Sequence, residues 1–321
     1  MTGGTAAAAN SSRAWRHPAV WLFAAFLALP IPAHFGANAY ILSFATHAVA
    51  LGLAALSLDL MLGIGALASF GHAAYLGIGA YSVAILSDMG HDDLLVQIPV
   101  AIAVASVFAG ITGFVSLRAS GVYYIMSTLA FGQMLYFLAQ SLSAYGGDDG
   151  VTLAARSRLA GSHLLASDLG LYYVTLAALI AAYVLLDRIV GSRFGRVLGA
   201  VRQNPMRVRA VGLDPFRYRL LASILAGSLC AVAGVLLANQ SEFVSPAFMT
   251  WQRSGELLVM VVLGGMGRLW GAVLGAICFL TLEEVLPGLT DNWKMVLGAL
   301  LILAALGRGS RLSQLFKGVG R

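Results

Sequence analysis

The side chains best suited to chemistry are concentrated in one basic segment, 192–219, which reads SRFGRVLGAVRQNPMRVRAVGLDPFRYR. It holds seven arginines against a single acid, Asp214. Guanidinium groups recognise carboxylates and phosphates, so the chemistry is binding to an anionic partner rather than catalysis. The pattern predicts a short amphipathic helix over 196–211, ended by Gly212, which docks into a groove on a soluble protein. A second interpretation is a basic loop that binds lipid headgroups.

A second set of candidate residues consists of polar and glycine positions within otherwise apolar segments. Polar side chains inside a membrane are costly, so each one is a candidate for lining a transport path. The alternative is that they serve hydrogen bonding and tight helix packing only. We expect Asp59 to reach water at the end of its apolar segment. The candidate pathway residues are Ser69, Gly71, His72, Thr128, Gln133, Gly264 and Gly265.

Motifs for catalysis or metal binding are missing from the sequence. There is no GxxxxGK[ST] loop to hold a nucleotide, and there is no HExxH, CxxC or GxSxG motif. Both cysteines, Cys230 and Cys278, lie in apolar segments. We therefore expect no catalytic residue, no metal site and no cofactor in this chain, so any chemical energy must come from another subunit.

The elements that must position these residues are membrane-spanning helices. The chain has 321 residues, of which 59% are hydrophobic and 11% are charged, whereas soluble domains carry about 25% charged residues. Its apolar runs are long enough to cross a hydrocarbon layer about 30 Å thick. Backbone groups in lipid must be satisfied within the segment, so the spans are helical. The predicted fold class is all-α, a polytopic membrane bundle.

The distribution of basic residues predicts about ten spans, with eight or nine full crossings as the alternative. With the N-terminus inside, 16 basic residues fall in cytoplasmic segments and 4 outside, out of 20. This asymmetry is typical of membrane proteins and puts both termini in the cytoplasm. Membrane topology thus explains the net charge of +6, and we expect no nucleic-acid partner. The predicted spans are 18–33, 39–62, 66–87, 94–117, 121–141, 170–190, 219–238, 254–266, 268–286 and 292–307.

The predicted domain organisation is a single transmembrane permease domain over 18–307, flanked by two cytoplasmic tails. Residues 1–17 are expected to be disordered, and 308–321 form the C-terminal tail. The longest external loop, 143–170, contains the turn-rich stretch YGGDDGVTL. It is interpreted either as a solvated connection or as a gate that contacts an external protein.

Two glycine-rich stretches, 62–86 and 263–276, lie in the two halves of the chain. Glycine allows helices to pack closely, and it also allows a membrane helix to break where its backbone lines a cavity. The pair therefore indicates either a duplicated transport architecture with Gly-broken helices or close packing alone.

Five stretches together resemble one family, the LivM-type permease subunits of branched-chain amino acid ABC importers. LSLDLMLGIGALASFGHAAYLGIGAY is similar to the family form LNLLxGxxGxLSLGHAAFxGIGAY, and GVYYIMSTLAFGQM is similar to GIYFAMxTLAFxQ. The stretch YGGDDGVTL, the basic segment and the stretch VSPAFMTWQRSGELLVMVVLGGMGRLWGAVLGA follow in the family's order. Together they cover most of residues 57–276.

The resemblance implies one pore-forming half of an importer in the bacterial inner membrane. Its partners would be a sister permease subunit, two cytoplasmic ATPase subunits that bind ATP and magnesium, an external solute-binding protein and membrane lipid. The segment 192–219 would then hold the ATPase-coupling helix. The resemblance implies coupling roles for Phe194, Gly195, Arg196, Ala200, Arg202, Asn204, Arg209 and Gly212.

Several departures from the family pattern leave partner and substrate identity open. Asn204 is followed by Pro205, and Arg207 and Arg209 stand where relatives often carry acids. Ala272 replaces a frequent proline. Hydrophobic amino acids are the expected substrates, with urea, short amides or aromatic acids as alternatives. A stand-alone secondary transporter or channel, and a membrane scaffold, remain as readings of another class.

Overall fold

The computed structural model describes residues 21–23, 26–27, 39–159, 161–162, 164–290, 292, 295–299 and 302. The predicted tails 1–17 and 308–321, and most of the predicted spans 18–33 and 292–307, lie outside the described residues. The long helices are α4 (Ala39–Asp59), α5 (His72–Asp88), α6 (Leu94–Ser116), α7 (Val122–Ser141), α8 (Asp168–Gly191), α11 (Pro215–Ser241), α12 (Trp251–Gly264) and α13 (Leu269–Val285). The shorter elements are η1 (Leu60–Ile64), η2 (Ser143–Tyr145), β1 (Val151–Thr152), η3 (Leu164–Ala166), α9 (Arg193–Gln203), α10 (Pro205–Ala210), β2 (Phe243–Val244), η4 (Pro246–Met249) and η5 (Leu286–Gly288).

Six helical stretches within the described residues are long and apolar enough to cross a membrane. They confirm a helical, multi-pass protein, while the predicted total of about ten spans stays a prediction. Helices α5 and α12, which correspond to the predicted spans 66–87 and 254–266, have 17 and 14 residues. The six stretches are Tyr40–Ile64, Leu94–Ser116, Val122–Ser141, Asp168–Gly191, Pro215–Ser241 and Leu269–Gly288.

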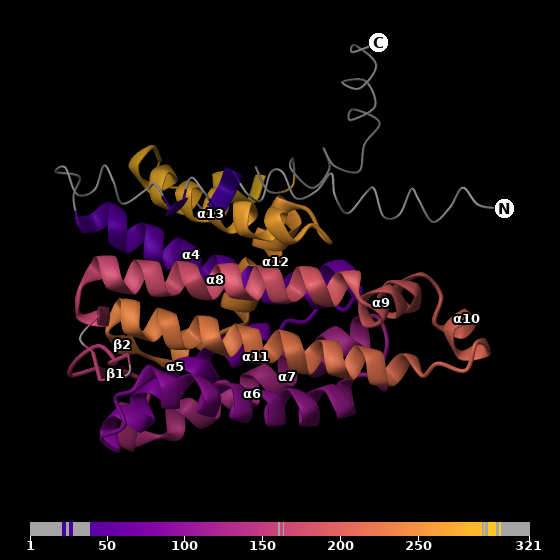
Figure 1. Cartoon of the computed structure of the whole chain (residues 1–321), viewed down its shortest axis with the longest axis horizontal. Coiled ribbons are helices and arrows are strands. Elements are labelled where there is room, and N and C mark those ends of the chain that lie inside the picture. The colour runs from indigo at the N-terminus through magenta and orange to yellow at the C-terminus, as the bar shows by residue number, and fades with distance from the viewer. Residues whose placement is uncertain are drawn as a thin grey trace, which may run out of the picture.

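Helices α4 and α11 form the centre of the bundle. Helix α11 packs against α4, α5 and α6, and α4 also packs against α8, α12 and α13. Among the 18 most apolar consecutive residues of each stretch, 78% are buried in α4–η1 and 61% in α11, but only 28% in α6 and 22% in α7. Figure 1 shows α12 and α13 on one side of α4 and α11, and α6 and α7 on the other. The outer faces of α6 and α7 are therefore available to lipid or to another subunit.

Glycine permits an unusually close crossing of α5 and α11. A Cβ added to Gly79 on α5 would stand 2.0 Å from the carbonyl oxygen of Ala231, and one added to Gly234 on α11 would stand 1.9 Å from that of Leu76. Small residues let membrane helices approach to backbone contact. The two helices are thus held backbone to backbone, without intervening side chains.

The helical path is broken over residues 65–71, so α5 begins only at His72 rather than at 66. Side chains bind the backbone N–H groups at this break. Phe70 N–H donates to Thr128 Oγ1 at 3.3 Å, and Ala73 N–H donates to Ser254 Oγ at 3.0 Å. Irregular backbone at membrane depth is tolerated when it is buried in protein. A second break, between α12 and α13, turns through Gly265 and Gly267 at φ +106° and +79°.

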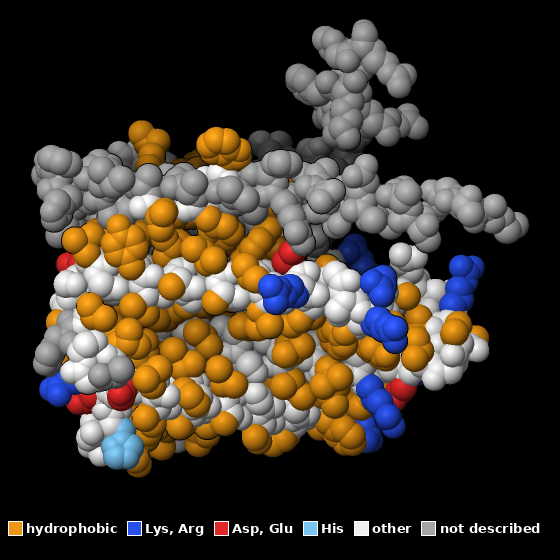
Figure 2. Space-filling view, viewed as in Figure 1, with side chains coloured by type: hydrophobic (Ala, Val, Ile, Leu, Met, Phe, Trp, Pro, Cys, Tyr) orange, Lys and Arg blue, Asp and Glu red, His pale blue; other side chains and the backbone are white. Residues whose placement is uncertain are grey.

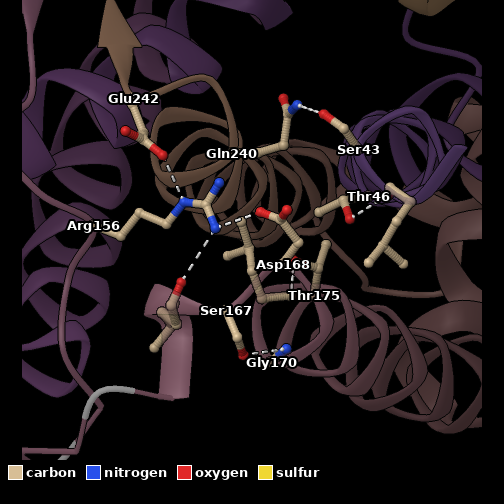
Figure 3. Close-up of polar contacts among 12 residues, drawn as sticks. Ser43, Thr46, Arg156, Ser167, Asp168, Gly170, Thr175, Gln240 and Glu242 are labelled. Carbon is tan, nitrogen blue, oxygen red and sulfur yellow. Dashed lines mark hydrogen bonds and ion pairs between the residues drawn. The ribbon is translucent and has the colours of Figure 1, made fainter. Parts of the chain in front are cut away.

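The external-loop candidate 143–170 is anchored to the bundle by polar contacts. Strands β1 and β2 pair antiparallel at this end. Arg156 Nη1 lies 2.7 Å from Asp168 Oδ1, and its Nε lies 2.8 Å from Glu242 Oε1. Figure 3 shows the guanidinium of Arg156 pointing between these two acids, which lie on α8 and at the end of α11. Arg156 therefore ties the loop to two helices.

Candidate functional site

The basic segment folds as two short helices, α9 and α10, rather than the one helix predicted over 196–211. Asn204 is extended at φ −158° and ψ 101°, and Pro205 lacks the N–H needed to continue α9. The Asn204 side chain accepts hydrogen bonds from the N–H groups of Met206 and Arg207 at 3.0 and 3.1 Å. This caps α10 as a new helix. The chain then turns at Gly212, where φ is +84°.

Helix α9 has one face buried against the bundle and one face exposed. Its buried residues are Gly195, Leu198 and Val201. Arg193, Arg196, Ala200 and Gln203 are exposed, at the spacing of three to four residues that places side chains on one side of a helix. The bundle thus fixes the orientation of α9 and turns its polar face outward.

The exposed faces of α9 and α10 enclose a groove of about 750 Å³, named here the α9–α10 groove. Three arginines and apolar side chains line it, and none of its lining residues is an acid. Figure 2 shows Lys and Arg side chains gathered over this end of the molecule. A surface of this kind suits a protein segment that carries both carboxylates and apolar side chains. The lining residues are Arg193, Arg196, Val197, Ala200, Gln203, Asn204, Arg207, Val208, Val211, Leu213 and Tyr218.

Of the predicted coupling residues, Arg196, Ala200 and Asn204 line this groove. Phe194 and Gly195 instead fix α9 to the bundle. The ring of Phe194 packs on Tyr218 with a centroid distance of 5.7 Å. There is no room for a side chain at Gly195, because a Cβ there would stand 2.2 Å from the carbonyl oxygen of Val190.

The remaining predicted coupling residues have different positions. Arg202 lies on α9 but donates from Nη1 to the backbone carbonyl of Gly63, away from the groove. Arg209 is exposed on α10, and Gly212 forms the turn that follows. The predicted set therefore divides between a groove-facing group and residues that hold the segment in place.

Three of the predicted pathway residues, Ser69, Gly71 and Thr128, come together around a small internal cavity between α5, α6, α7 and α11. Its polar groups are hydroxyls, and no charged side chain lines it. The full lining is Met61, Ser69, Gly71, Tyr75, Phe108, Thr112, Gly113, Tyr124, Thr128, Phe131, Gly132 and Ser223.

The other four predicted pathway residues do not line this cavity. His72 is fully buried, with Nε2 2.9 Å from Ser57 Oγ. Gln133 is half-buried on α7. Gly264 and Gly265 lie at the α12–α13 break, where a Cβ on Gly264 would stand 1.8 Å from the carbonyl oxygen of Gly271.

Comparison with known proteins identifies the family. A family model described as the branched-chain amino acid transport system / permease component matches residues 40–305. The chain belongs to this family. The match covers nearly all of the described bundle, including both glycine-rich breaks and the α9–α10 groove. This confirms the family that the sequence motifs predict, and the chain spans about two thirds of the length of the relatives that match most of it.

Individual relatives of this chain are named for the transport of different solutes. The high-affinity branched-chain amino acid transport system permease protein LivM of Escherichia coli is 27% identical over 276 residues, which cover 79% of this chain and 65% of the relative's length. The autoinducer 2 import system permease protein LsrC of Klebsiella pneumoniae is 34% identical over 149 residues, covering 44% and 42%. The probable permease protein LivH of Methanocaldococcus jannaschii is 33% identical over 108 residues, covering 32% and 31%. No solved structure matches the permease significantly.

Some residues that line the α9–α10 groove and the internal cavity were not predicted from the sequence. The helical spacing from Arg196 through Ala200 indicates Arg193 and Gln203. The groove residues absent from the predicted coupling set are Arg193, Val197, Gln203, Arg207, Val208, Val211, Leu213 and Tyr218. In the cavity, the hydroxyl residues Tyr75, Thr112, Tyr124 and Ser223 were missed. They come from different helices, and only helix packing brings them together. No group of three or more potential metal ligands occurs in the described part of the permease.

Proposed function

We propose that this chain is one pore-forming subunit of an ATP-driven importer in the bacterial inner membrane. It moves branched-chain or other hydrophobic amino acids into the cytoplasm. The observation that supports this most is the α9–α10 groove, in which arginines and apolar side chains face outward at one end of a membrane bundle. A free-standing carrier has no need of such a surface.

Separate ATPase subunits supply the energy in this proposal. They bind ATP and magnesium, since this chain has no GxxxxGK[ST] loop. One ATPase docks at the α9–α10 groove and presents carboxylates to Arg193, Arg196 and Arg207. Closure of two ATPases around ATP then moves the docked helices and switches the bundle between two states.

The other proposed partners are a sister permease, an external solute-binding protein and lipid. The local similarity to a LivH protein supports a sister of the same family. The apolar outer faces of α6 and α7 give it, or lipid, a surface to contact. The anchored loop 143–170 is the proposed contact for the binding protein.

Amino acids are the proposed substrate class because a relative that covers most of this chain is a branched-chain amino acid permease. The similarity to LsrC makes autoinducer 2 the second candidate substrate. Urea, short amides and aromatic acids are further candidates. The hydroxyl-lined cavity, at about 10 Å³, has room for about one water molecule and is too small to hold any of these solutes in the conformation described.

The test is copurification followed by transport. The tagged chain is expressed with neighbouring genes for a second permease, ATPases and a binding protein, and bound ATPase is identified after purification. The complex in proteoliposomes, supplied with binding protein, should take up labelled leucine only when ATP is present. A complex whose ATPase binds but does not hydrolyse ATP is the control. Uptake by this chain alone without ATP would instead establish a stand-alone carrier and overturn the proposal.

A further inference from the structure

Asp59 is an acid buried at the junction of α4 and η1, with none of its surface exposed. The sequence-based expectation that it reaches water is therefore wrong. Its Oδ1 accepts a hydrogen bond from the N–H of Gly267 at 2.7 Å, and its Oδ2 has no hydrogen-bond partner among the described residues. A buried carboxylate requires a nearby positive charge to stay ionised. The hydrogen bond from Gly267, a neutral N–H group, does not supply that charge.

Arg202 of α9, which is itself exposed, contributes a positive charge near Asp59. Its guanidinium lies close enough to Asp59 for a favourable electrostatic interaction. Nη1 of Arg202 donates to the carbonyl of Gly63, and it lies 3.9 Å from where a Cβ on Gly267 would stand. One turn earlier on α9, Leu198 Cδ1 lies 3.7 Å from where a Cβ on Gly65 would stand. Helix α9 therefore contacts η1 at Gly63 and also contacts Gly65, the residue that follows η1.

Three segments that are distant in sequence meet without spare room at this point, named here the Asp59 junction (Asp59, Gly63, Arg202 and Gly267). A Cβ on Gly63 would stand 2.1 Å from Asp59 Oδ1 and 2.2 Å from the nitrogen of Gly267. Interfaces packed this tightly change between discrete arrangements rather than deform gradually.

Two of the three segments at the Asp59 junction, η1 and the turn at Gly267, lead toward the internal cavity. Helix η1 continues directly into the break 65–71, and the N–H of Leu67 donates to the carbonyl of Met61 at 2.9 Å. Ser69 and Gly71 of that break line the cavity, as does Met61 itself. Gly267 follows α12, whose Ser254 binds the N–H of Ala73 at the start of α5. The Asp59 junction is therefore connected by contacts to the cavity region along two routes.

We propose that Arg202 and Asp59 are positioning residues that transmit movement of the docked α9 helix to the cavity-lining break. This inference rests on the proposed function and names the internal link that it needs. When the ATPase displaces α9, Arg202 leaves Gly63 and Asp59 loses the favourable charge of Arg202. The turn at Gly267 and the π-helical η1 then rearrange together, and the break 65–71 follows.

The test compares transport with ATP hydrolysis in the reconstituted complex. The variants are Arg202→Gln, Arg202→Lys and Asp59→Asn, which keeps an acceptor for Gly267 but loses the charge. The matched control is Arg188→Gln, an exposed arginine at the end of α8. We expect Arg202→Gln to assemble and hydrolyse ATP within about two-fold of the parent, while uptake per ATP falls about ten-fold, within the usual range of coupling between sites. Asp59→Asn should have the same effect, and Arg202→Lys should restore part of the loss. Uptake per ATP equal to that of the control would overturn the inference.

A second measurement uses the purified chain without ATPases. Backbone hydrogen exchange over 60–71 and 265–268 should speed up about ten-fold in Arg202→Gln, because local opening depends on the contacts removed. It should not change in Arg188→Gln. Unchanged exchange in Arg202→Gln would overturn the inference even if that variant does not assemble. This outcome is separate from the proposed function, which fails only if no ATPase binds or ATP is not required.

Discussion

Arginine is used in opposite ways at the two ends of the bundle. At the end that carries β1 and β2, the Arg156 side chain is only 16% exposed and is paired with the protein's own acids, Asp168 and Glu242. At the other end, Arg193, Arg196 and Arg207 surround an open groove that has no acid in its lining. The first arrangement closes a loop onto the helices, whereas the second presents charge to something outside the chain. The comparison teaches that burial and pairing, rather than residue type, separate a structural arginine from one placed for recognition.

Charge reversal in the groove is expected to have the largest effect. In the double variant Arg196→Glu, Arg207→Glu, like charges face the proposed acidic partner, which costs several kcal/mol at an interface. Affinity for the ATPase, measured by copurification and by binding to the purified subunit, should fall about 100-fold, or about 2.7 kcal/mol. The melting temperature should not change, because both side chains are exposed.

The control for this variant is Arg158→Glu, Arg188→Glu, which reverses the same number of charges outside the groove. An equal loss of affinity in the control would show that net charge, rather than the groove, attracts the ATPase. Unchanged affinity in the groove variant would show that Arg196 and Arg207 do not recognise the ATPase. The proposed difference in the use of arginine at the two ends of the bundle would then be wrong.

Arg156→Ala tests the opposite end and should affect stability instead of partner binding. It removes the ion pairs that connect the loop to α8 and α11, and it leaves Asp168 and Glu242 without their shared cation. Fully buried ion pairs cost about 3–5 kcal/mol to break, but Asp168 and Glu242 are 45% and 47% exposed. We therefore expect a loss of about 2 kcal/mol, intermediate between buried and surface pairs, measured by thermal unfolding in detergent. Arg158→Ala, at an exposed neighbour, should change stability by less than about 0.5 kcal/mol; if both variants lose the same stability, the pairing of Arg156 is not what matters.

Asn204→Ala should have the smallest of the three effects. It removes the cap of α10 and should cost about 1 kcal/mol, confined to that helix. Hydrogen exchange should rise over Pro205–Ala210 but not over α9, and ATPase affinity should fall only a few-fold. Asn204→Ser retains a side-chain acceptor and should restore protection. Equal exchange in the Ala and Ser variants would show that the cap does not set the shape of the groove.

Sequence patterns predicted the helical membrane fold and the exposed basic segment, because hydropathy and arginine spacing are local properties. The division of that segment into α9 and α10 was missed although its cause, Pro205 after Asn204, is visible in the sequence. The burial of Asp59 was not predictable in the same way. Its partners, Gly267 and Arg202, come from distant segments, and only the packing of α9 and the α12–α13 turn against η1 brings them together.

The cavity illustrates the same limit. Ser69, Gly71 and Thr128 were selected because they are unusual within apolar segments, and they do lie together. Gln133 and His72 met the same criterion but point to other surroundings. Composition can thus indicate which residues are unusual, whereas the surroundings of each depend on how its helix or break packs in the bundle.

The crossing of α5 and α11 also restricts how this sequence can diverge. The obstacle to a side chain at Gly79 or Gly234 is a carbonyl oxygen on the opposite helix, and every amino acid carries that atom. A larger residue at either position therefore cannot be accommodated by a smaller one across the contact, as happens when two side chains meet. Homologues that keep this crossing must keep glycine at both places, and those that lose either glycine must hold the two helices further apart.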